Sequence, residues 1–128
     1  MDWTLEVVVV PVADVDRAKR FYAEQVGFAV DHDTDAGGGT RIVQLTPPGS
    51  GCSIVIGTGL PGSDAAPLKG LQLVVSDIEA ARAQLLARDV AVSAVHEIDP
   101  RDGGRFVYFD DPDGNSWAVQ EIRARARA

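Results

Sequence analysis

The stretch that decides the fold is Val12-Ala13-Asp14-Val15-Asp16-Arg17-Ala18-Lys19, which returns 63 residues later as Val75-Ser76-Asp77-Ile78-Glu79-Ala80-Ala81-Arg82. In both copies a β-branched run ends in valine, a small residue and aspartate, and a helical spacing of apolar residues begins. Asp14 and Asp77 are helix N-caps by residue type. Each predicted helix carries one apolar stripe, so each is expected to pack on a flat apolar surface. Gly27 is placed to end the first helix.

A second repeat follows each predicted helix. Residues 45–56 correspond to residues 109–120, at an offset of 64, and each copy reads as strand, turn and strand. Between helix and hairpin each copy has one more β-rich stretch, Phe28-Ala29-Val30 and Val90-Ala91-Val92-Ser93-Ala94-Val95. The order is therefore β-α-β-β-β, twice, which predicts an α+β fold. We expect module one over about 4–57, a Gly/Pro/Ser-rich linker over about 58–68, module two over about 69–121 and a tail over 122–128.

Bulk composition excludes some classes of function. The 128 residues carry 12 Lys+Arg against 19 Asp+Glu, a formal charge of -7, which argues against nucleic-acid binding. No apolar run reaches the length of a membrane span, and the N-terminus has no basic region typical of a signal peptide. Cys52 is the single cysteine, so no internal disulfide forms and a reducing cytoplasmic location is expected.

Four ordered segments resemble the vicinal oxygen chelate superfamily, which contains glyoxalases, bleomycin resistance proteins and dioxygenases. They are residues 12–22, Val26-Gly27-Phe28, residues 75–81 and Asp111-Pro112-Asp113-Gly114-Asn115. The resemblance runs from about residue 5 to Glu121. It implies a cupped, eight-stranded mixed sheet around a cavity. In metal-dependent members His, Glu or Gln residues on strands one, four, five and eight hold a divalent cation.

The ligand positions that the resemblance implies hold no metal-binding side chains. Counted from the two repeats and the Asp-Pro-Asp-Gly turn, they are Val7, Ile54, Gly70 and Ala118. None offers the imidazole, carboxylate or thiolate that a divalent metal requires, so we predict no metal and no cofactor. Residues two positions further along each strand share the same face. The predicted cavity is therefore lined by Val7, Val9, Ile54, Ile56, Gly70, Gln72, Ala118 and Gln120.

Few other residues have catalytic chemistry. His32 and His96 are the two histidines, and either would serve as a general base if it reached the cavity. Glu6 has suitable chemistry but the opposite strand parity to Val7. Other polar and aromatic residues have ordinary structural interpretations: Arg41 and Arg105 are expected to face solvent or acidic neighbours, Cys52 to pack, and Trp117 and Tyr108 to lie in the core or line a pocket.

Two classes of function remain open. The first is a metal-free protein that binds a small, mostly apolar molecule, with the amides of Gln72 and Gln120 orienting it. The alternative to this ligand-orienting role is a purely structural one, in which the two glutamines bond only each other or water. The second class is a metal-independent enzyme of the lyase or isomerase type with His32, His96 or Glu6 as base, and a metal-dependent lyase or dioxygenase ranks third. We expect a homodimer with a small-molecule partner and neither nucleic acid nor membrane. The ligand, and whether the modules pair within a chain or across a dimer, stay open.

Overall fold

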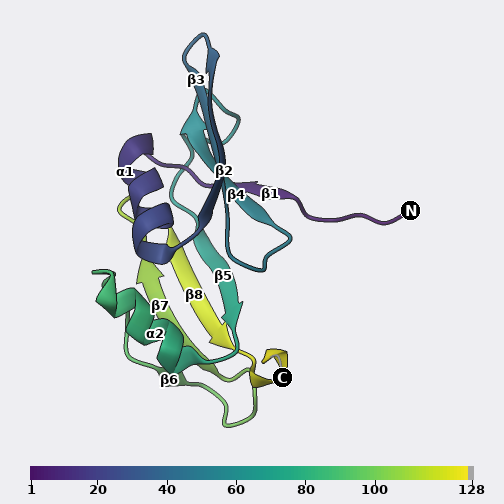
Figure 1. Cartoon of the computed structure of the whole chain (residues 1–128), viewed down its shortest axis with the longest axis vertical. Coiled ribbons are helices and arrows are strands. Elements are labelled where there is room, and N and C mark those ends of the chain that lie inside the picture. Colours follow the sequence, from purple (N-terminus) through teal and green to yellow (C-terminus); the bar gives the residue numbers. More distant parts are fainter. Residues whose placement is uncertain (127–128) are drawn as a thin grey trace. The chain divides into compact units, whose positions relative to one another are not determined.

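The computed structural model describes residues 1–126, which divide into two compact units, Met1–Pro67 and the part that begins at Leu68. In the first unit, module one, the elements are β1 (Val7–Val9), α1 (Val15–Arg20), its continuation η1 (Phe21–Val26), β2 (Ala29–Gly37), β3 (Thr40–Thr46) and β4 (Ser53–Thr58). They form a mixed sheet in the order β1-β4-β3-β2, in which β1 and β4 are parallel (Figure 1).

Module two repeats this arrangement. Its elements are β5 (Lys69–Val75), α2 (Ile78–Ala87), β6 (His96–Glu97), β7 (Arg105–Asp110) and β8 (Ser116–Glu121), followed by the short turn η2 (Arg123–Arg125). The sheet order is β5-β8-β7-β6, with β5 and β8 parallel (Figure 1). The predicted α+β fold of two tandem βαβββ modules is confirmed, with four strands in each sheet. Of the predicted tail, residues 127 and 128 lie outside the described part. No helix in residues 1–126 has the length and apolarity to cross a membrane.

Both helices begin as the sequence predicts. The carboxylate of Asp14 accepts a hydrogen bond from the main-chain nitrogen of Arg17 at 3.0 Å, and that of Asp77 accepts one from Ala80 at 3.1 Å. Gly27 ends η1 with φ of 96°, a left-handed conformation that favours glycine. These caps satisfy main-chain groups that the helix ends leave unpaired.

One face of each sheet is buried beneath its helix. In module one this helix face carries Val10, Val43, Leu45 and Ile56, which are all fully buried, and α1 contacts β4. Tyr22 adds a buried ring that stacks against Phe28 at 5.6 Å. In module two α2 contacts β7 and β8 in the same way. We call the opposite side of each sheet its open face.

The β-rich stretch predicted over 90–95 is wrong in position. The strand there is β6, His96–Glu97, and residues 90–95 run irregularly beside β7. Ser93 explains the difference. Its main-chain nitrogen donates to the main-chain oxygen of Tyr108, and its hydroxyl oxygen accepts a hydrogen bond from the main-chain nitrogen of Tyr108. A side chain thus replaces a backbone acceptor and interrupts the ladder.

The Asp-Pro-Asp-Gly-Asn turn is tied into the module by two buried side chains. The carboxylate of Asp111 accepts hydrogen bonds from the main-chain nitrogens of Asp113 and Asn115 and from Nδ2 of Asn115. Oδ1 of Asn115 accepts from the main-chain nitrogen of Leu68 at 2.8 Å. The turn between β7 and β8 therefore also fixes the start of β5, which explains why a simple turn needs an asparagine at this position.

Candidate functional site

The open face of module two is the first candidate binding surface. Strand register brings five side chains together on it: Gln72, Ala118, Gln120, Phe106 and Tyr108. The alternate residues point toward α2, and Trp117 is accordingly only 4 % exposed while Tyr108 is 39 % exposed. Of the two aromatics for which the sequence left a core or pocket role open, Trp117 is therefore in the core and Tyr108 lies on the open face.

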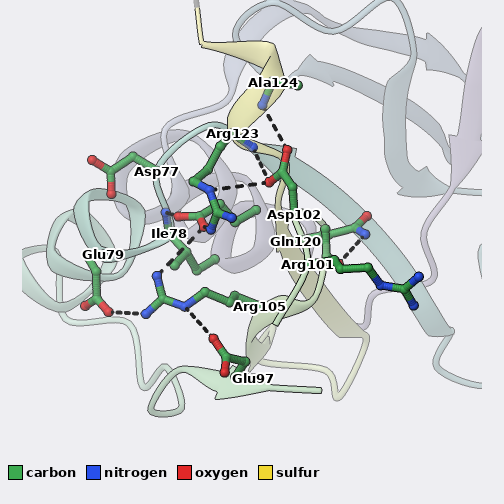
Figure 2. Close-up of polar contacts among 12 residues, drawn as sticks. Asp77, Ile78, Glu79, Glu97, Arg101, Asp102, Arg105, Gln120, Arg123 and Ala124 are labelled. Atoms are coloured by element: carbon green, nitrogen blue, oxygen red, sulfur yellow. Dashed lines mark hydrogen bonds and ion pairs between the residues drawn. The ribbon is translucent and has the colours of Figure 1, made fainter. Parts of the chain in front are cut away.

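The two glutamines of this face bond each other. Nε2 of Gln72 donates to Oε1 of Gln120 at 2.8 Å, and Nε2 of Gln120 donates to the main-chain oxygen of Gly103 at 2.8 Å. Gly103 belongs to the loop before β7, which begins at Arg105, and Figure 2 labels Gln120 with its neighbours Arg101 and Asp102. The bond to Gly103 fixes which end of the Gln120 amide is the donor. Gln72, which is exposed, keeps its own carbonyl oxygen and one N–H for another partner.

A row of rings lies next to the glutamine pair. Phe106 and Tyr108 are parallel, with ring centroids 6.2 Å apart, and the His96 ring lies 5.6 Å from that of Tyr108. Two open depressions border the module. One, of about 510 Å³, is lined by Ala91, Val92, Ser93, Tyr108, Phe109 and Asp110. The other, of about 370 Å³, is lined by Asp99, Arg101, Asp102, Gly103, Gly104 and Gln120.

The open face of module one contains only part of the predicted set. Val7 pairs with Ser53 and Val9 with Val55, so these four share the open face. Ile54 and Ile56 do not. They pair with Leu45 and Val43, which are buried on the helix face, so the prediction that they share a face with Val7 and Val9 is wrong.

The reason for this error is the length of one turn. In module one, Leu45 pairs with Ile54, whereas in module two Phe109 pairs with Trp117. The connection in module one is therefore one residue longer, and the offset between the modules falls from 64 before the turn to 63 after it. Because strand side chains alternate between faces, one extra residue reverses the face of every later position. The counterpart of Ala118 is Val55 rather than Ile54.

The corrected ligand positions still do not fit a divalent metal. They are Val7, Val55, Gly70 and Ala118, and none has a donor atom in its side chain. Gly70 has a backbone reason to be glycine, since it lies at a bulge in β5 with φ of 102°. Within residues 1–126 no group of three or more His, Cys, Asp and Glu side chains is arranged to hold a metal ion.

Arg41 and Arg105 bind acidic neighbours on the helix faces, as predicted. Arg41 bonds Asp16 and Asp33, each at 2.8 Å, and Lys19 also bonds Asp33. The Arg41 guanidinium, followed by the Lys19 ammonium, holds the pKa of Asp33 well below its usual value. Arg105 contacts Glu79, Glu97 and Glu121 in module two (Figure 2). These arginines brace helix against sheet and are not ligand contacts of the open faces.

The three candidate bases do not form a catalytic cluster. His32 pairs with Gln44 on the open face of module one, and His96 lies on the open face of module two. Both side chains are exposed. Glu6 precedes β1, is exposed, and accepts through its main-chain oxygen a hydrogen bond from the main-chain nitrogen of Ser53. No hydrogen bond joins either histidine to another side chain among the described residues.

The structure adds a polar cluster that the sequence did not single out. The hydroxyl of Thr46 bonds the carboxylate of Asp31, and the hydroxyl oxygens of Thr46 and Ser53 are 2.6 Å apart. A bulge in β2 between Val30 and His32 puts Asp31 within reach of Thr46. The only available signal was a polar run, residues 31–35, inside a strand. A bulge of this kind cannot be located from residue types.

The comparisons with known proteins agree with this architecture. The model of the Glyoxalase/Bleomycin resistance protein/Dioxygenase superfamily matches residues 4–119. No curated protein sequence matches the chain.

Among solved structures, TnmS3, an antibiotic binding protein from Streptomyces sp. CB03234, is 34% identical over 94% of this chain and 97% of its own, with a TM-score of 0.79. A glyoxalase/bleomycin resistance protein from Streptomyces sp. CB03234 is 35% identical over 92% of this chain and 100% of its own, with a TM-score of 0.76. A superfamily member from Sphaerobacter thermophilus DSM 20745 is 27% identical over 94% of this chain and 98% of its own, with a TM-score of 0.77.

Proposed function

Since the chain belongs to the glyoxalase/bleomycin resistance protein/dioxygenase superfamily, we propose that it is a metal-free protein that binds a small, largely apolar molecule on the open face of a module. The observation that carries this proposal is the composition of the open face of module two. Phe106 and Tyr108 offer ring surface, and the Gln72 amide offers one acceptor and one donor. This combination suits binding and orientation, and it lacks the clustered titratable groups typical of an active site.

Similarity supports the same class of function. TnmS3, which matches nearly the whole chain, is an antibiotic binding protein. We extend to this chain the general property of small-molecule binding. The residues we assign to it are Val7, Val9, Gly70, Gln72, Ala118 and Gln120, to which the strand register adds Val55, Phe106 and Tyr108.

Native mass spectrometry of the protein purified from its source tests the proposal. The expected spectrum contains a bound organic molecule of a few hundred daltons and far less than one equivalent of metal per chain. The bound molecule, once identified, should be recovered unchanged after prolonged incubation with fresh protein. Stoichiometric metal, with thermal stability lost in chelator, contradicts the metal-free assignment. Conversion of the molecule to a product contradicts the assignment as a pure binding protein.

A metal-independent lyase or isomerase is the second candidate, because His32 and His96 each lie on an open face. The variants His32→Asn and His96→Asn distinguish the two functions. A binding protein keeps its ligand unchanged in both variants. An enzyme loses turnover in one of them while its affinity for the molecule stays within about threefold, because a general base acts mainly in the transition state. Glu6→Gln provides the same test for the remaining candidate base.

A further inference from the structure

We infer that module one carries a subsite for a protonated amine, built from Asp31, Thr46 and Ser53. The inference rests on the proposed small-molecule binding and specifies a chemical group of the ligand. It follows from the direction of the hydrogen bonds in this cluster and from the pairing of the charges along β2.

The direction of the hydrogen bonds leaves only acceptors in the cluster. An ionised carboxylate accepts and does not donate, so the hydroxyl proton of Thr46 points to Asp31. The bond between Thr46 and Ser53 must then be donated by Ser53. Both hydroxyl protons are thereby used within the cluster. What remains for a ligand is the second oxygen of Asp31 and the lone pairs of the two hydroxyls, which all accept.

The cluster is fixed in place at its inner end. Ser53 is 6 % exposed, and its main-chain nitrogen donates to the main-chain oxygen of Glu6 at 2.8 Å. At the outer end Asp31 is exposed. The row thus runs from the buried strand β4 to the solvent-accessible strand β2. Its hydroxyls need no rearrangement to accept a donor, which reduces the entropic cost of binding.

Charge pairing along β2 shows that Asp31 lacks a counter-ion. Asp33 is bound by Lys19 and Arg41, whereas Asp35, for which the described residues provide no cation, accepts a hydrogen bond from the main-chain nitrogen of Gly37 at its own hairpin. In the part of the chain that the structure describes, Asp31 has no cationic partner, and Thr46 is its one hydrogen-bond donor. An ammonium group would supply the missing charge and the missing donors together.

The neighbouring residues define what the amine is attached to. Val55 lies two residues from Ser53 on the same face of β4, a distance of about 7 Å along a strand. Val9 is its partner on β1, and Ile42 is on the same face of β3. Val9 and Val55 supply aliphatic surface beside the acceptors; Val55 is 7 % exposed, and Gln44, its partner on β3, lies on the same face. The ligand class is therefore an apolar body that carries a primary or secondary amine within roughly that distance.

A matched pair of probes tests the subsite: 2-(1-naphthyl)ethylamine and 2-(1-naphthyl)ethanol, which differ in the charged donor. Each is titrated into ¹⁵N-labelled protein at pH 8, where an alkylamine is protonated, and the main-chain amide shifts of β2, β3 and β4 are followed. The amine is expected to bind about tenfold more tightly than the alcohol, since hydrogen bonds to charged groups are stronger than neutral ones. Asp31→Asn should reduce this ratio to about one.

Asp35→Asn is the matched control, because it removes the same charge from the same strand and keeps an acceptor for Gly37. It should retain the tenfold preference, and the spectra of both variants report whether the fold is intact. Equal binding of the two probes by the unmodified protein overturns the amine subsite and leaves the proposed binding function standing. A preference that survives in Asp31→Asn also overturns it. If the protein binds neither probe, the amine subsite is also overturned. The native mass spectrum then decides separately whether the protein binds a small molecule.

Discussion

Gln72 and Gln120 are joined by a hydrogen bond of 2.8 Å across the parallel strands β5 and β8. Gln120 is the inner member of the pair, because its Nε2 also donates to the main-chain oxygen of Gly103. The two amides therefore have different roles. One is held by the loop before β7, and the other is presented to solvent.

This asymmetry predicts unequal costs of truncation. Gln120→Ala should lower the free energy of unfolding by about 1 kcal/mol, because the Gly103 carbonyl and the Gln72 amide both lose a partner. Gln72→Ala should cost less than about 0.5 kcal/mol, since an exposed amide is rehydrated. Urea denaturation followed by tryptophan fluorescence measures both values. Equal costs would contradict the assignment of Gln120 as the anchored member.

Asn115→Ala should be among the most damaging substitutions in module two. The side chain is fully buried and connects Asp111 to the main-chain nitrogen of Leu68, so its removal takes the acceptor from Leu68 and one hydrogen bond from the buried Asp111. We expect a loss of about 2 to 4 kcal/mol. Ser50→Ala in the exposed turn of module one, where the hydroxyl bonds main-chain groups of Cys52, is the control and should cost less than about 1 kcal/mol. Chemical denaturation of the two variants under identical conditions provides the comparison.

Glu121 is a second buried polar residue with a structural role. Its carboxylate accepts from the main-chain nitrogen of Ile78 at 2.9 Å and bonds Arg123 at 3.0 Å, near Arg105 (Figure 2). Glu121→Ala should cost about 3 kcal/mol, because the buried main-chain nitrogen of Ile78 loses its acceptor and the guanidinium groups of Arg123 and Arg105 lose a carboxylate partner. Glu79→Ala, which removes an exposed partner of Arg105, should cost less than about 1 kcal/mol. A similar effect of both variants on the melting temperature would contradict this ranking.

The lowered pKa of Asp33 predicts an acid-dependent contribution to stability. Its carboxylate is more acidic in the folded chain than in the unfolded chain, where the pKa is about 3.9. The contribution is therefore present above about pH 4 and is lost as pH falls toward the folded value. The difference in melting temperature between the unmodified protein and Asp33→Asn should be largest near pH 7 and should shrink below about pH 4. In an Arg41→Gln background the same difference should depend less on pH, and an unchanged dependence would exclude Arg41 as the main cause.

The exposed apolar arm before β1 supports the proposal of a homodimer. Trp3 is 88 % and Leu5 71 % exposed, and both lie in the segment that leads into β1 at Val7. Two-fold association is the commonest way in which a soluble protein covers such a surface. Light scattering at tens of micromolar should give twice the mass of one chain, and Trp3→Asp should shift that equilibrium toward the monomer. A monomeric mass for the unmodified protein would refute the proposal.

The sequence by itself determined the repeated module and much of its local structure. The Val-small-Asp segments predicted both helix starts, because the chemistry of an N-cap is local to three residues. For Arg41 and Arg105 the sequence left solvent and acidic neighbours as alternatives, and the structure shows the acidic neighbours. The sequence also showed that the implied metal positions lack donor side chains. The correction from Ile54 to Val55 leaves this conclusion unchanged, because it replaces one aliphatic residue with another.

Only the tertiary structure decided which side chains share a face. One extra residue in the turn before β4 moved Ile54 and Ile56 to the helix face, and a bulge in β2 brought Asp31 to Thr46. Neither the extra turn residue nor the bulge changes the pattern of residue types that is visible in the sequence. Strand side chains alternate with a period of two, so the position at which an extra residue is absorbed sets the orientation of everything after it. That position depends on pairing with strands distant in the sequence, and so the local sequence does not specify it.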